Sequence, residues 1–171
     1  LHAATGRSVV AYDRAGYGRS TLSDTSATTR RYQPDFMHTE ALDVLPALLD
    51  DLGVERPVLV GHSDGASIAM IAAARGIEVA GLALIAPHVL VEDVCLEGIR
   101  QISTQRDAIV AGLARHHRRP DLVFDRWRDI WLDSAFRAWD ITGLLGDIAS
   151  DVPVTAVQGD RDEYATDAML A

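Results

Sequence analysis

A serine at position 63 stands in a pattern that could make its hydroxyl a nucleophile. Residues 61–65 read Gly-His-Ser-Asp-Gly, which fits the pattern G-x-S-x-G. The apolar residues 58–60 before it predict a buried strand, and the small and apolar residues from Ala66 onward predict a helix. A tight turn between a strand and a helix lifts a serine hydroxyl off the edge of the sheet. The pattern therefore predicts a nucleophile elbow at Ser63, poised for attack on a carbonyl carbon.

The residues beside Ser63 have predicted roles in the turn. We expect glycine at positions 61 and 65 because a Cβ on Gly61 or Gly65 would collide with a neighbouring element. The backbone N–H of Asp64 lies at the positive end of the predicted helix, so it would point at an oxyanion formed above the serine. His62 belongs to the turn itself, and its side chain is not expected to face Ser63 as a base.

Other side chains able to do chemistry are spread along the chain. The six histidines are His2, His38, His62, His88, His116 and His117. We expect His88 to lie near the strand edge as a pocket or cap residue, with Trp127 and Trp131 as further candidates for the pocket. His116 and His117 lie among arginines at a helix end, and we expect them to be solvated. No spacing predicts a metal site, and we expect neither a metal nor an organic cofactor.

The elements around the serine alternate between strands and helices. Besides residues 58–60, strands are predicted at residues 8–12 (SVVAY), 79–86 (VAGLALIA) and 153–158 (PVTAVQ). Asp35 is expected to cap a helix over residues 36–52 that Pro46 kinks. The predicted inner face of this helix carries four leucines: Leu42, Leu45, Leu49 and Leu52. The alternation predicts a parallel α/β sheet with right-handed crossovers.

Two segments differ from this alternation. Residues 21–31 are polar and predict a flexible loop, whereas residues 88–150 show helical periodicity. Within the longer segment, one helix is predicted over residues 93–117 and a second from Asp121. A helical insertion between two parallel strands commonly lies as a lid over the strand ends where ligands bind. The predicted division is therefore a core part at residues 1–87, a helical cap at 88–150 and a return to the core at 151–171.

Composition favours one domain of ordinary size and excludes several partners. The 171 residues are 48% hydrophobic and carry a formal net charge of −9. This acidity argues against a nucleic acid or an anionic membrane as the partner. No apolar stretch reaches the ~18 residues of a membrane span, and the single cysteine, Cys95, fits a reducing compartment. We therefore expect a cytoplasmic protein that binds a small-molecule substrate, with its oligomeric state left open.

Four motifs, taken in order, resemble the α/β-hydrolase superfamily, in its branch of esterase-like enzymes with a helical cap. They are D-x-x-G-x-G-x-S at residues 13–20, the elbow at 61–65, the strand end at 86–88 followed by helices, and G-x-x-D at 159–162. The resemblance implies a partial parallel hydrolase core with a cap insertion. It also implies that Ser63 is the nucleophile and that Asp162 is the carboxylate that orients a histidine.

The acid that the resemblance implies has alternatives. Asp160 and Glu163 have the same chemistry but lie in the wrong register of the motif. Some relatives place the acid after the preceding strand, where this chain has Glu92 and Asp93. A carboxylate in such a turn also commonly caps the turn. Of these residues the motif favours Asp162.

The chain departs from the superfamily pattern at both ends. The catalytic histidine should follow Asp162, and no histidine does. A strand and a loop that supply the second oxyanion donor should precede residue 8. We therefore expect a fragment, inactive by itself, whose triad histidine lies beyond this chain. A further strand of the superfamily's sheet would separate residues 8–12 from 58–60, so these stretches should sit apart or pair non-natively.

The resemblance implies a serine hydrolase that acts on a small ester or a related carbonyl compound. A serine at the elbow, instead of an aspartate, favours such substrates over haloalkanes. A C–C hydrolase or a cofactor-free haloperoxidase-like enzyme would use the same residues. The alternative of another class is a non-catalytic protein of the same fold that binds a ligand or a partner, which the missing histidine would fit.

Overall fold

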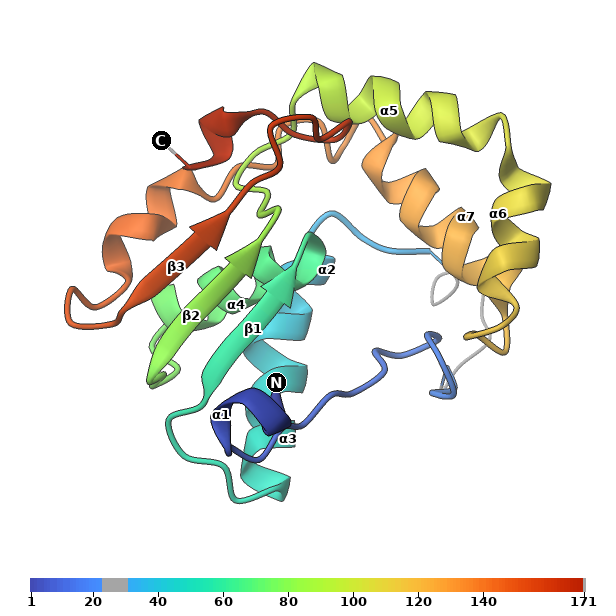
Figure 1. Ribbon diagram of the computed structural model, residues 1–171. Coiled ribbons are helices and arrows are strands. Elements are labelled where there is room, and N and C mark those ends of the chain that lie inside the picture. Colours follow the sequence, from blue (N-terminus) through green and yellow to red (C-terminus); the bar gives the residue numbers. More distant parts are fainter. Residues whose placement is uncertain (23–30, 171) are drawn as a thin grey trace.

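The computed structural model describes residues 1–22 and 31–170, and its centre is a parallel sheet of three strands (Figure 1). The strands are β1 (Val58–His62), β2 (Gly81–Ile85) and β3 (Val154–Val157), and β2 lies between the other two. Val60 pairs with Ala83, and Ala83 pairs with Thr155. The predicted parallel α/β sheet is therefore confirmed, with each strand a little shorter or longer than its apolar run.

Helices cover one face of this sheet. α4 (Asp64–Ala74) connects β1 to β2 and is buried from Ala66 to Ala73, because its small side chains let it lie close to the strands. Leu82 and Leu84 of β2 are buried on this face. The side chains that alternate with them point to the other face, where Ile85 is 45% exposed. The core of the described chain therefore lies on one side of the sheet.

The helical stretch predicted over residues 36–52 differs from an ideal helix. It consists of α2 (Phe36–Thr39), the π-helical turn η1 (Glu40–Val44) and α3 (Leu45–Asp51). The π turn precedes Pro46, which has no N–H to donate to the carbonyl of Leu42. The extra residue in the turn rotates the helix face. Leu45 is buried as predicted, but Leu42 and Leu52 are 40% and 48% exposed, so the predicted leucine face is wrong at those positions.

Residues 8–12 do not form the predicted strand. They follow the short helix α1 (His2–Thr5) without pairing to β1, and Val9 and Val10 are 49% and 57% exposed. An extended segment needs a neighbouring strand to satisfy its backbone groups, and no described strand lies beside it. A cavity of about 490 Å³ separates Tyr12 from Leu59 and Val60. The two stretches therefore sit apart, as expected from the resemblance.

The segment between β2 and β3 is helical, as predicted, but its first helix is broken. It contains α5 (Asp93–Ser103), α6 (Arg106–Leu113), α7 (Pro120–Trp131) and the 3₁₀ turn η2 (Thr142–Asp147). Ser103 Oγ donates to the carbonyl of Ile99 at 2.6 Å, and Thr104 Oγ1 donates to that of Gln101 at 2.7 Å. Such side-chain bonds compete with the helical ladder, so the chain breaks where one helix was predicted over residues 93–117.

Helices α5, α6 and α7 of the helical insertion lie beyond the C-terminal ends of the strands, whereas η2 runs back beside the sheet and packs against α4 (Figure 1). The chain returns through β3 to the short 3₁₀ helix η3 (Asp167–Leu170). Within the described ranges, no helix is both long enough and apolar enough to cross a membrane. Most of the polar loop predicted at residues 21–31 lies outside the described residues, since 23–30 are not described.

Candidate active site

Ser63 occupies a strained turn between β1 and α4. Its φ and ψ are 53° and −123°, in a region that a residue with a Cβ rarely adopts. The N–H of Ser63 donates to the carbonyl of Ile85 at 2.9 Å, and its carbonyl accepts from the N–H of Ala66 at 2.8 Å. The turn is therefore fixed to the neighbouring strand and to the first turn of the helix. Its geometry is that of the predicted elbow.

The two glycines of the elbow differ in what surrounds them. A Cβ on Gly61 would lie 2.2 Å from the carbonyl oxygen of Gly65 and 2.5 Å from the backbone nitrogen of Ala66. A Cβ on Gly65 would meet nothing within 4 Å, so the predicted collision there is wrong. Gly65 lines the cavity of about 490 Å³ between β1 and Tyr12, which explains the free space. Only the first glycine is required by its surroundings.

Replacing Gly61 with alanine should therefore destabilise the protein strongly. The atoms that its Cβ would meet belong to the backbone of the elbow, which cannot move away without undoing the turn. We expect a loss of about 3 kcal/mol or more in the free energy of unfolding. Gly65→Ala is the matched control, and it should be neutral or stabilising by up to about 1 kcal/mol because Gly65 lies in a helix. Urea unfolding of both variants measures the difference; equal losses would contradict the assigned geometry.

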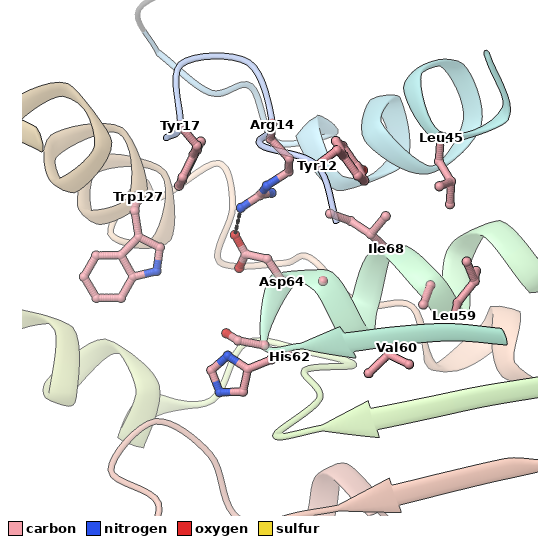
Figure 2. A pocket seen from close by; sticks show the side chains of 13 residues that line it. Tyr12, Arg14, Tyr17, Leu45, Leu59, Val60, His62, Asp64, Ile68 and Trp127 are labelled. Atoms are coloured by element: carbon pink, nitrogen blue, oxygen red, sulfur yellow. Dashed lines mark hydrogen bonds and ion pairs between the residues drawn. The ribbon is translucent and has the colours of Figure 1, made fainter. Parts of the chain in front are cut away.

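Two cavities meet at Ser63. The larger, of about 490 Å³, is also lined by Arg14 and Asp64 (Figure 2). The smaller, of about 220 Å³, is also lined by His88 and Asp162. His62 and Trp127 line both cavities. The smaller cavity is also lined by Trp131, Cys95 and Tyr164. The serine therefore faces space on two sides, as a residue that attacks the middle of a substrate would need.

Asp162 reaches the smaller cavity with both carboxylate oxygens engaged. Oδ1 accepts from the N–H of Tyr164 and Oδ2 from Nε2 of Gln158, each at 2.8 Å. The structure thus brings Ser63, Asp162 and the predicted pocket residues around one cavity. The alternative acids lie elsewhere. Asp160 and Glu163 are exposed, Glu92 accepts two bonds from Thr166, and Asp93 pairs with Arg137.

His88 is buried in the wall of the smaller cavity. It is 4% exposed, its ring centroid lies 4.9 Å from that of Trp131, and its carbonyl accepts from Ser67 Oγ at 2.6 Å. Burial lowers the pKa of His88, and His62 lowers it slightly further. The carboxylates of Asp64, Asp162 and Glu92 act in the opposite direction, but burial is the largest effect. The imidazole is therefore neutral at pH 7. Burial also raises the pKa of the Cys95 thiol, to about 12, so this residue stays a thiol.

The lowered pKa of His88 predicts a pH dependence of stability. Between the unfolded and folded pKa values the unfolded chain binds the proton and the folded protein does not, so stability falls as pH decreases below about 6.5. We expect His88→Phe, which keeps a ring against Trp131, to reduce this slope. Urea unfolding of the wild type and of H88F between pH 5.5 and 8 measures the slope of stability against pH. Burial also lowers the pKa of His38, but this histidine contributes equally in the two proteins. An unchanged slope would contradict the assignment.

Several residues near the site carried no signal in the sequence. Arg14 Nη2 contacts Asp64 Oδ2 at 3.2 Å. Arg126, from α7, is 8% exposed and donates to the carbonyl of Ala15 at 2.9 Å. His117 was expected to be solvated, but it is half-buried, and its Nδ1 accepts from a backbone N–H at 2.8 Å, that of Gly18. Contacts between residues 50 to 111 positions apart leave no trace in periodicity, so the sequence alone could not predict them.

Comparison with known proteins gives one family. Residues 1–170 match a family model described as "Alpha/beta hydrolase family". A structure from a study of carboxylesterases of the thaumarchaeon Nitrososphaera gargenis is 18% identical, with a TM-score of 0.56 over 90% of this chain and 62% of its own. An alpha/beta hydrolase fold protein from Burkholderia ambifaria is 20% identical, with a TM-score of 0.46 over 76% of this chain and 57% of its own. This chain thus spans less than two thirds of either structure. No curated protein sequence matches it.

Proposed function

This chain belongs to the alpha/beta hydrolase family, and on that premise we propose that it is the Ser63-bearing part of a serine hydrolase that cleaves small carboxylic esters. The observation that carries the proposal is the elbow itself. Ser63 is held at a positive φ at the start of α4, and it shares a cavity with Asp162. A strained residue at a cavity is a common feature of active sites.

The proposed reaction is acyl transfer to water. Ser63 Oγ attacks the ester carbonyl while a general base takes its proton, and the N–H of Asp64 holds the oxyanion. The alkoxide leaves with that proton, and water then releases the acid from the acyl-serine by the same steps. Asp162 orients the base, which we propose to be a histidine outside this chain, because none follows Asp162 in the sequence.

The two cavities beside the serine support a small ester as the substrate. The cavity of about 220 Å³ has an aromatic wall that includes Trp127 and Trp131, which would receive one side of the ester. The cavity of about 490 Å³ would receive the other. In this proposal residues 88–150 act as the cap over the site, the reaction uses no cofactor, and the protein works in the cytoplasm.

The experiment is ester hydrolysis by the product of the longest open reading frame that contains residues 1–171. We expect p-nitrophenyl acetate, butyrate and octanoate to be cleaved, because all three fit within the two cavities at Ser63. Residues 1–171 alone should be slower by about 10⁴-fold or more, since a triad member is missing. A folded full-length protein that cleaves none of these esters would contradict the proposal.

A second candidate function is that of a non-catalytic protein of the same fold that binds a small ligand. The two cavities at Ser63 favour it, because they would hold such a ligand whether or not it is turned over. This function predicts that the complete reading frame has no histidine after Asp162 and that no ester is cleaved. Cleavage of a C–C bond or peroxide-dependent halogenation would use the same residues, and substrate panels of those classes test them directly.

A further inference from the structure

Asp64 places a carboxylate one residue after the proposed nucleophile. Its side chain is 9% exposed, while its backbone N–H is the donor that the proposed reaction uses for the oxyanion. A buried negative charge so close to a developing negative charge repels it, because the low local dielectric strengthens the interaction. The N–H of Asp64 can stabilise the oxyanion only if the charge of its own side chain is compensated.

Arg14 supplies the opposite charge. Its Nη2 lies 3.2 Å from Asp64 Oδ2, and its side chain is 19% exposed. Figure 2 shows the Arg14 side chain pointing at Asp64, and both residues line the larger cavity. Within the described part of the chain, the remaining atoms Arg14 Nη1 and Asp64 Oδ1 have no hydrogen-bond partner. The two charges therefore compensate chiefly each other.

The loop that carries Arg14 is held by the helical insertion. Arg126 Nη1 donates to the carbonyl of Ala15 at 2.9 Å, and the N–H of Gly18 donates to His117 Nδ1 at 2.8 Å. The guanidinium of Arg14 also lies 4.8 Å from the ring centroid of Tyr17 in the same loop. Arg14 is thus fixed before any substrate arrives, and the charge of Asp64 is compensated without reorganisation of the site.

We propose that Arg14 is a positioning residue that neutralises Asp64, so that the N–H of Asp64 can stabilise the oxyanion formed at Ser63. The proposal rests on the proposed function of Ser63 and adds a residue to it. It differs from a purely structural role, in which the pair only holds the loop of residues 13–20 against the elbow. The two roles separate when both charges are removed together.

The test compares wild type with Arg14→Met, Asp64→Asn and the double variant R14M/D64N, all in the longest open reading frame that contains this chain. We expect R14M to lower kcat for p-nitrophenyl acetate about tenfold or more, with a smaller change in KM. D64N keeps the backbone N–H but leaves the charge of Arg14 uncompensated, and it should lower kcat less than R14M does, because that charge is opposite in sign to the oxyanion. The double variant should return to within about threefold of wild type, because no uncompensated carboxylate remains.

Urea unfolding of each protein shows whether a change in kcat comes from a change in stability. If R14M does not fold, Arg14→Lys, which keeps the positive charge, tests whether that charge is what kcat depends on. R14K should then retain most of the kcat. A double variant as slow as R14M, or an R14K as slow as R14M, overturns the proposal while leaving the proposed function intact. Turnover that is the same in the wild type and in a folded Ser63→Ala variant overturns both this proposal and the proposed function.

Discussion

Replacing Ser63 with alanine is expected to lower kcat for p-nitrophenyl acetate by about 10⁴- to 10⁶-fold in the full-length protein. The hydroxyl is the only atom group that the substitution removes, and in the proposed reaction it forms the bond to the acyl carbon. Alanine at a φ of 53° is as strained as serine, so the turn itself should persist.

The control for this variant is Ser134→Ala, an exposed serine outside both cavities. It should leave kcat unchanged. Stopped-flow release of p-nitrophenol measures both the burst and the steady state, and S63A should lose the burst entirely. Turnover retained by a folded S63A would place the nucleophile at another residue.

Replacing Asp162 with asparagine is expected to lower kcat by about 10⁴-fold. An amide cannot stabilise a charged imidazolium, and its NH₂ group favours the wrong tautomer of the base. Asparagine keeps the volume of the side chain, its oxygen can still accept from the N–H of Tyr164, and its NH₂ group can donate to Gln158 Oε1 once that amide is turned over. Much of the loss should therefore be in kcat and little in the free energy of unfolding.

Asp160→Asn is the matched control, two residues earlier in the same turn. The Asp160 side chain is 95% exposed and lies 3.9 Å from Arg161, so its contribution to stability is small. We expect wild-type kcat for D160N. If D160N and D162N lost activity equally, the turn as a whole would matter and the role of Asp162 as the acid would be wrong.

The local elements of this fold could be predicted from the sequence because short-range rules decide them. The strand, turn and helix around Ser63 follow from apolar runs and from glycine at position 61. Such short-range rules failed where the structure of a segment depends on what packs beside it or on a change in helix geometry. Val9 and Val10 have strand propensity, yet they stay unpaired because no described strand lies beside them. The leucine face of residues 36–52 failed because a π turn before Pro46 shifts the phase of the helix.

The composition of the candidate site was partly predictable for a similar reason. Parallel strands end at one edge of a sheet, which explains why Ser63 after β1, His88 after β2 and Asp162 after β3 line one cavity. The pairing of Arg14 with Asp64 was not predictable, because it joins a loop to the first residue of α4, 50 residues later, and follows no periodicity. The free space beside Gly65 was equally hidden, because it depends on what lies next to β1.

Covalent labelling of Ser63 is the most direct measurement of reactivity at the elbow. The full-length protein would be incubated with a fluorophosphonate probe, and the modified peptide would be identified by mass spectrometry, with urea-unfolded protein as the control. A single phosphonyl adduct on Ser63 of the folded protein, absent after unfolding, is the predicted result. A folded protein that remains unlabelled at Ser63, or that is labelled at another serine, would contradict the assignment of Ser63 as the nucleophile.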